Sequence, residues 1–139
     1  MSDTLTDIIE SFELLDDWED RYRYVIELGR ELPPYPEEMR NDTHKVPGCV
    51  SQVWLLTHQS NDKDPIMTFQ GDSDAHIVRG LVYIILAFYS GQKASDIINA
   101  DIAALLKKLG LDENLTPQRS NGLRAMINRI QSDAKNALQ

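Results

Sequence analysis

The single cysteine of the chain, Cys49, is the residue whose type and setting best suit covalent chemistry. It follows Pro47 and Gly48, and a proline–glycine pair is typical of a sharp turn that exposes the next residue. An apolar run begins directly after the cysteine, so the thiol precedes the expected strand. A buried cysteine that acts as a small hydrophobic residue fits the same pattern. The residues alone therefore leave two interpretations open, a core thiol and a reactive one.

A cysteine nucleophile in a hydrolase needs a base to take its proton, and three histidines could supply one. His44 precedes Cys49 in the same loop, His58 lies near the far end of the strand, and His76 lies at the start of a helix. None of these spacings matches a cysteine protease or transferase motif. One cysteine and scattered histidines provide no paired metal ligands, and no glycine-rich phosphate loop is present. We therefore expect neither a metal nor a cofactor.

The composition of the chain limits its partners and its compartment. Its 139 residues, 42% of them hydrophobic, suit one domain over 1–139 with a real core. The formal net charge of -8 argues against nucleic acid or an anionic membrane as a partner. The N-terminus shows no secretory signal, and the longest apolar run, 81–89, is about half the length of a membrane span. A chain with one cysteine cannot form an internal disulfide, so we expect the reducing cytoplasm.

The elements that must position Cys49 are mainly helical. Apolar residues recur at spacings of three and four at both ends of the chain, and Asp16 or Asp17 can cap the second helix. The stripe over 77–88 is apolar almost all round, which places its helix at the centre of the domain. Thr116 and Pro117 are typical of a helix cap and first turn. The helices are expected over 5–15, 17–32, 77–90, from 95, over 101–109, and from 116 onward.

Between these helices lies an expected antiparallel hairpin. The run CVSQVWLLTHQ at 49–59 is β-branched and apolar, a polar turn follows, and IMTFQG at 66–71 is a second run. Helices packed on a small antiparallel sheet of about three strands give an α+β fold. Trp54 is expected to face the core, and Asp72 and Asp74 are expected to cap the central helix.

Four blocks of the sequence resemble the SufE family of cysteine-desulfurase sulfur acceptors, in the same order and over nearly the whole chain. The resemblance implies an α+β fold related to iron–sulfur scaffold proteins, and it places the family's reactive residue on Cys49. Scaffolds hold a cluster with several cysteines, so a single cysteine favours a carrier of sulfur over a builder of clusters. The blocks are WEDRYRYVIELGRELP at 18–33, GCVSQVW at 48–54, GDSDAHIVRGL at 71–81 and LTPQRSNGLRAM at 115–126.

This resemblance implies a non-enzymatic sulfur acceptor that also activates a pyridoxal-phosphate-dependent cysteine desulfurase of the SufS or CsdA kind. Cys49 would take persulfide sulfur and relay it to an iron–sulfur scaffold or another acceptor. Arg119, in the matching TPQRS block, is expected to place a positive charge near the thiol, because the thiolate is the attacking species. The other side chains expected to support the site are His44, Ser51, Gln52 and Asp74.

Two rival classes stay open at this point. A thiol enzyme acting on a small substrate would use His44 as its base, and a structural adaptor would depend on the acidic surface and not on Cys49. The carrier hypothesis makes one further demand, since an exposed persulfide would be reduced or oxidised by other thiols and oxidants. We therefore expect two states of the Cys49 loop, one turned toward the domain and one extended into the desulfurase.

Overall fold

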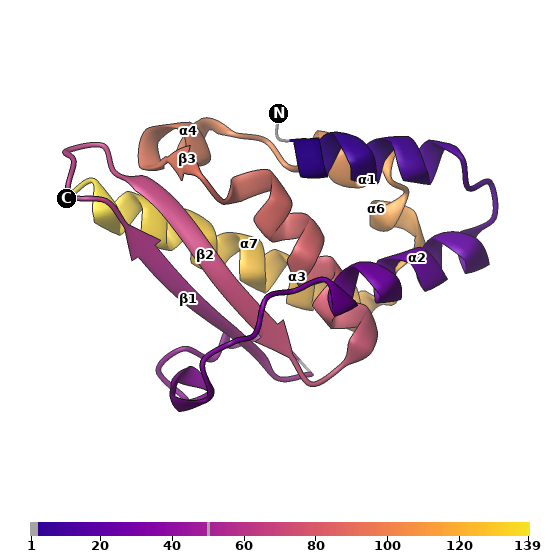
Figure 1. The fold of residues 1–139 in the computed structure, drawn as a ribbon, viewed down its shortest axis with the longest axis horizontal. Helices are drawn as coiled ribbons and strands as arrows, with labels where there is room; N and C mark the ends of the chain where they lie inside the picture. The colour runs from indigo at the N-terminus through magenta and orange to yellow at the C-terminus, as the bar shows by residue number, and fades with distance from the viewer. Residues whose placement is uncertain (1–2, 50) are drawn as a thin grey trace.

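The computed structural model describes residues 3–49 and 51–139 (Figure 1). Within these ranges helices pack against a three-stranded antiparallel sheet, which confirms the α+β class. None of the described helices is long and apolar enough to cross a membrane. The elements are α1 (Asp3–Glu13), α2 (Trp18–Arg30), a 3-10 helix η1 (Glu37–Met39), β1 (Val53–Gln59), β2 (Ile66–Ser73), α3 (His76–Tyr89), β3 (Gln92–Lys93), α4 (Ala94–Asn99), α5 (Ala103–Lys108), α6 (Leu111–Asn114) and α7 (Pro117–Ala137).

The sheet has the order β1-β2-β3, and its first two strands form the predicted hairpin. β1 begins at Val53, which pairs with Ser73, and not at residue 49 as the apolar run predicted; residue 50 lies outside the described residues. The free edge of β1 is partly covered by the segment before Cys49. There the Val46 N–H donates to the Val53 carbonyl at 2.8 Å, and the Leu55 N–H donates to the His44 carbonyl at 2.9 Å. The two ends of the Cys49 loop are thus tied together.

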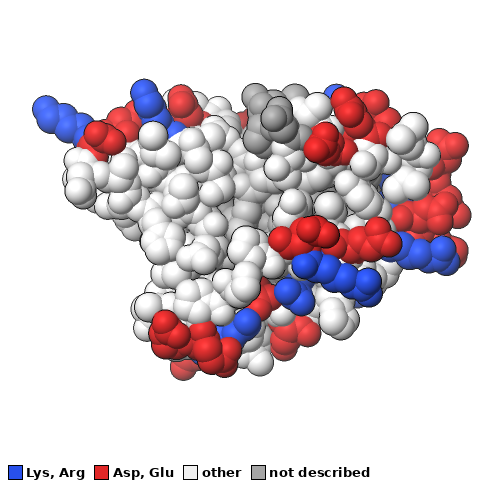
Figure 2. Space-filling view, in the orientation of Figure 1, with Lys and Arg blue, Asp and Glu red and all other residues white. Residues whose placement is uncertain are grey.

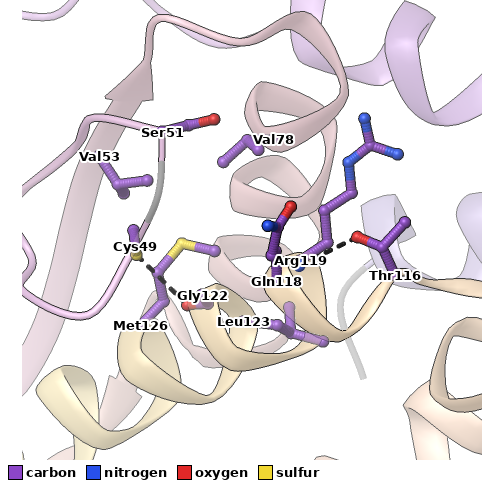
Figure 3. Close-up of a pocket in the computed structure, with 10 residues that line it drawn as sticks. All are labelled: Cys49, Ser51, Val53, Val78, Thr116, Gln118, Arg119, Gly122, Leu123 and Met126. Carbon is purple, nitrogen blue, oxygen red and sulfur yellow. Dashed lines mark hydrogen bonds between the residues drawn. The ribbon is translucent and has the colours of Figure 1, made fainter.

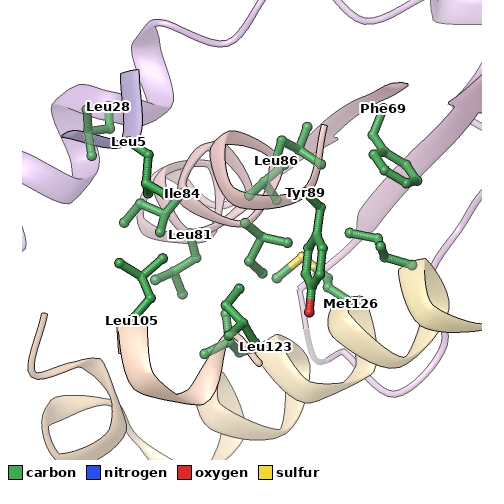
Figure 4. Packing of buried hydrophobic residues seen from close by; sticks show 14 of the residues in the cluster. Leu5, Leu28, Phe69, Leu81, Ile84, Leu86, Tyr89, Leu105, Leu123 and Met126 are labelled. Carbon is green, nitrogen blue, oxygen red and sulfur yellow. The ribbon is translucent and has the colours of Figure 1, made fainter. Parts of the chain in front are cut away.

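The core is built around α3, as its nearly all-apolar sequence predicts. In Figure 1 this helix lies between the sheet, the helices α1 and α2, and the long helix α7. Figure 4 shows its side chains between residues from α1 and α2 on one side and residues from α5 and α7 on the other. Burying such side chains is the main favourable term in folding. Those of α3 that are buried include Leu81, Ile84, Ile85 and Tyr89.

Helices α2 and α3 approach each other more closely than side chains would allow. A Cβ atom added at Gly80 would lie 1.9 Å from the carbonyl oxygen of Val25, and one added at Gly29 would lie 2.7 Å from the Gly80 nitrogen. Distances this short are not sterically accessible to real atoms, so only glycine permits the crossing. The α2–α3 pair is therefore fixed in place by backbone contact.

The caps of the flanking helices follow the sequence prediction at two positions. Asp17 caps α2 and accepts a hydrogen bond from the Glu19 N–H at 3.1 Å. Thr116 caps α7, with Pro117 in the first turn, and accepts from the Arg119 N–H at 3.3 Å. Each side chain satisfies a backbone donor that the first helical turn leaves without a partner.

The prediction that Asp72 and Asp74 cap α3 is wrong. The N-cap residue is Ala75, and no side chain caps the helix there. Asp72 lies in β2, where it is buried and forms ion pairs with the guanidinium groups of Arg40 and Arg79. Asp74 turns instead to the base of the Cys49 loop. The pairing of β1 with β2 continues to Ser73 and keeps Asp72 in the strand, and the carboxylate of Asp74 accepts from the Gln52 N–H.

The prediction that Trp54 faces the core is also wrong. Val53 and Leu55 are buried, and Trp54 points to the opposite face of β1, as alternation along a strand requires. It is half-buried there under Arg40, whose guanidinium carbon lies 5.3 Å from the centre of the indole ring. Trp54 therefore helps to hold η1 and its flanking residues against the sheet.

The surface carries its acidic side chains unevenly. Figure 2 shows them gathered at the end of the molecule formed by α1 and α2, with another group near η1. The negative potential of a surface like this repels polyanions and attracts basic surfaces.

Candidate functional site

Cys49 lies in a tight turn directly before β1. Gly48 has a φ angle of +90°, a backbone conformation that favours glycine, so the predicted turn is present. The cysteine is half-buried, and its thiol donates to the Gly122 carbonyl of α7 over 3.6 Å. The side chain therefore faces α7 and not open solvent. This arrangement lies between the two interpretations of the sequence, because the thiol is neither in the core nor fully exposed.

A cavity of about 190 Å³ opens beside the thiol, between the Cys49 loop, α3 and the start of α7 (Figure 3). One part of its wall is apolar and comes from β1, α3 and α7, whereas the other part is polar and comes from the loop and the first turn of α7. Its volume exceeds the roughly 30 Å³ that one water molecule occupies in the liquid, so it has room for one further sulfur atom. The lining residues are Cys49, Ser51, Val53, Val78, Thr116, Gln118, Arg119, Gly122, Leu123 and Met126.

Helix α7 supplies half of this lining because of its spacing. Arg119, Gly122, Leu123 and Met126 recur at three- and four-residue intervals, which places them on one face of the helix. Gly122 lies against the thiol, since a Cβ atom there would lie 3.5 Å from Cys49 Sγ. Sequence reasoning singled out Arg119 but missed the other three as site residues. Their helical spacing from Arg119 was the signal that could have found them.

The base of the Cys49 loop is held by the last residue of β2, Ser73, and by Asp74, which follows it. The Gln52 N–H donates to Asp74 Oδ1 at 3.0 Å, and the Asp74 N–H donates to the Gln52 carbonyl at 3.2 Å. The Ser73 hydroxyl donates to the same carbonyl at 2.7 Å. Gln52 and Asp74 are thus near Cys49 along the loop but do not line its cavity, whereas Ser51 does. The geometry gives Gln52 and Asp74 a part in fixing the loop.

His44 is not brought to the thiol. Its Nδ1 atom lies 2.9 Å from Asn41 Oδ1, and its side chain lines a separate cavity between β1 and α7 with Arg129 and Asp133. The backbone bond between His44 and Leu55 turns the ring away from the loop tip. In this conformation His44 has no geometry for taking a proton from Cys49.

Arg119 shares the cavity with Cys49 but directs its charge elsewhere. Its guanidinium carbon lies 5.6 Å from the centre of the Tyr22 ring on α2. Figure 3 shows the side chain pointing away from the thiol. Arg119 and Cys49 thus line the same cavity, and the expected closeness of the positive charge to the thiol stays a prediction.

The sequence matches the model of the SufE family, described as an Fe–S metabolism associated domain, over residues 6–134. This chain belongs to the SufE family. It is 61% identical to an uncharacterized SufE-like protein of Rhizobium etli over 95% of this chain and 90% of that protein. A second uncharacterized SufE-like protein, from Rhizobium meliloti, is 57% identical over 97% of each.

The fold of this SufE-family chain is also found in a solved structure. The solution structure of a hypothetical protein from Thermus thermophilus matches it with a TM-score of 0.73 over 96% of this chain and 95% of that one. The two sequences are 21% identical, so the likeness concerns the fold. In the described part of our SufE-family chain, no group of three or more His, Cys, Asp and Glu side chains could hold a metal ion.

The environment of Cys49 in this SufE-family chain favours the protonated thiol. Burial raises the pKa of Cys49, because desolvation disfavours the thiolate. The hydrogen bond to the Gly122 carbonyl acts in the same direction, since a carbonyl accepts from a thiol and repels a thiolate. The resting conformation therefore lowers the fraction of Cys49 that is thiolate, the nucleophilic form.

We expect alkylation of Cys49 by iodoacetamide to follow a pH profile whose midpoint lies above that of the same thiol in urea-unfolded protein. Folding favours the neutral thiol, so this group stabilises the fold below the unfolded-state pKa. That contribution is lost as the pH rises through the higher folded-state pKa. Alkylation rates of folded and unfolded protein across neutral and alkaline pH give both midpoints. A folded-state midpoint equal to or below the unfolded one would contradict the storage of a protonated thiol.

Proposed function

We propose that this chain accepts sulfur from a pyridoxal-phosphate-dependent cysteine desulfurase as a persulfide on Cys49, activates that enzyme, and relays the sulfur toward iron–sulfur cluster assembly. One observation carries the proposal: the single thiol lies at a glycine turn against a cavity with room for a second sulfur atom. Membership of a family associated with Fe–S metabolism supports it. The role is that of a carrier, because the thiol has no base beside it in the described structure.

The transfer is a thiol–disulfide exchange in kind. The Cys49 thiolate attacks the outer sulfur of the desulfurase persulfide, and a new S–S bond forms at Cys49. The S–S bond of the donor breaks, and its cysteine leaves as the thiolate that takes up the proton lost by Cys49. No external oxidant or reductant is needed, because the outer sulfur passes between thiols without a net change in oxidation. The same exchange at the next acceptor releases the sulfur.

The cavity gives the persulfide shelter between these two steps. A persulfide on Cys49 that keeps the resting orientation would lie beside this cavity, whose apolar lining includes Val53, Val78 and Met126. Apolar walls limit access of cytosolic thiols and oxidants, which would otherwise reduce or oxidise the sulfur. Arg119, on the opposite wall, is positioned to balance the charge of a persulfide anion when its side chain turns inward.

Both exchange steps require Cys49 to leave this cavity. The thiol faces α7, so the donor sulfur cannot approach it in line without an outward turn of the loop. The loop is fixed at one end by Val46 and Val53 and at the other by Gln52 and Asp74. A turn about Gly48 moves the cysteine while both anchors stay paired, which supports the two expected loop states.

Intact-mass measurement under non-reducing conditions tests the proposal. The chain is incubated with a cysteine desulfurase, its cofactor and free cysteine, and we expect its mass to increase by one sulfur atom. A parallel sample without free cysteine should show no increase. Absence of the increase with several desulfurases would overturn the carrier role.

A further inference from the structure

The guanidinium of Arg119 lies over an aromatic ring. Arg40 and Arg79 form ion pairs with the buried carboxylate of Asp72. Within residues 3–49 and 51–139, by contrast, Arg119 forms no salt bridge, and its guanidinium lies over the ring of Tyr22. A cation on an exposed or half-exposed aromatic face is held weakly compared with a buried ion pair. The Arg119 side chain is therefore held in a defined place by a contact that is easily broken.

The weakly held cation lies at the edge of the cavity beside Cys49. Among the described lining residues Arg119 alone carries a permanent charge, since the others from the loop, β1, α3 and α7 are neutral at neutral pH. The charged groups beside Tyr22 on α2 are Glu19 and Arg23, which have opposite signs. Asp74 lies at the loop base and accepts from the Gln52 N–H. No other described cation thus lines the cavity around the sulfur.

We propose that Tyr22 is a positioning residue for sulfur transfer, whose ring holds the Arg119 guanidinium away from Cys49 at rest and releases it to the sulfur during exchange. This role of Tyr22 rests on the proposed function, since a sulfur carrier needs a thiol that is inert alone and reactive when its partner is bound. Arg119 lies about one helical turn before Gly122, so both residues lie on one face of α7. The Gly122 carbonyl accepts the hydrogen bond from the Cys49 thiol. Because Gly122 has no side chain, space is left between Arg119 and the thiol.

The role of the Tyr22–Arg119 contact can be tested through the reactivity of Cys49 in the isolated protein. Tyr22→Leu keeps an apolar side chain against the core and removes the ring, so Arg119 is free to turn inward. We expect the alkylation midpoint to fall by about one pH unit, as for a thiol that gains a nearby cation. The thiolate fraction at neutral pH then rises about tenfold, while its nucleophilicity falls, which leaves about a threefold faster alkylation rate. Tyr22→Phe keeps the ring and should react like the wild type.

The arginine variants decide whether this effect passes through Arg119. The rate of Tyr22→Leu combined with Arg119→Gln, compared with that of Arg119→Gln alone, should show no threefold increase. Tyr22→Leu combined with Arg124→Gln, an exposed arginine on the same helix, should keep it. An unchanged or lower rate in Tyr22→Leu, or an increase that persists without Arg119, would overturn the proposal. Alkylation needs no desulfurase, so these results are separate from any failure of sulfur uptake.

Discussion

Cys49→Ser is expected to abolish the mass increase of one sulfur atom completely while leaving the unfolding curve close to that of the wild type. A serine oxygen cannot carry a persulfide, and no second cysteine is present to replace it. The hydroxyl is smaller than the thiol but keeps a donor for the Gly122 carbonyl. The backbone hydrogen bonds that anchor the loop do not involve this side chain. Intact mass and urea unfolding measure the two effects.

The same variant separates the carrier from its two rivals. An adaptor that works only through its acidic surface would let Cys49→Ser stimulate the desulfurase fully, and this result would contradict the carrier role. A thiol enzyme with His44 as base would lose most of its rate in His44→Gln. The contact of His44 with Asn41, away from the thiol, leads us to expect full sulfur uptake in that variant.

Gly80→Ala is expected to lower the free energy of unfolding by about 3 kcal/mol or more, the upper end of the usual range for overpacked cores. The added Cβ would lie 1.9 Å from the Val25 carbonyl oxygen, and this atom belongs to the backbone of α2, which cannot rotate away. Relief requires α2 and α3 to separate, which would open the packing of the core along both helices. Urea unfolding monitored by circular dichroism measures the loss.

Gly122→Ala is the matched control, because it makes the same change inside α7. Its Cβ would lie 3.5 Å from Cys49 Sγ, an ordinary contact distance. Alanine is favoured over glycine within a helix by about 0.5–1 kcal/mol, so this variant should be as stable as the wild type or more so. Equal stability of the Gly80 and Gly122 variants would show that the α2–α3 crossing tolerates a side chain.

The parts of the fold that could be predicted depend on neighbours along the chain. Helical periodicity gave the central position of α3, and local capping chemistry gave Asp17 and Thr116. Asp72 was misplaced because its partner Arg40 lies far away in the sequence, and only the folded chain brings the two together. Elements as short as β3, η1 and α6 bury too few residues to leave a periodic pattern. Their positions follow from packing and not from local sequence.

The candidate site, like the fold, has features that could be predicted from neighbours along the chain and features that could not. The turn at Gly48 could be read locally, and the family resemblance pointed to Cys49 and Arg119, which line one cavity. The contact of Tyr22 with Arg119 could not be predicted, because it joins α2 to α7 through the packing of both on the core. His44 is close to Cys49 in sequence, but its hydrogen bonds orient it away from the thiol.

The glycine crossing of α2 and α3 also decides which parts of this protein can move. Val25 and Gly80 touch through backbone atoms, so the two helices cannot slide or tilt past each other without a steric clash. Tyr22, one helical turn before Val25, therefore lies on a helix that this crossing fixes against α3. The proposed exchange calls for motion of the turn at Gly48 and of the long Arg119 side chain. The proposed sulfur transfer would then need no rearrangement of the domain, and its cost in conformational entropy would be confined to a few residues.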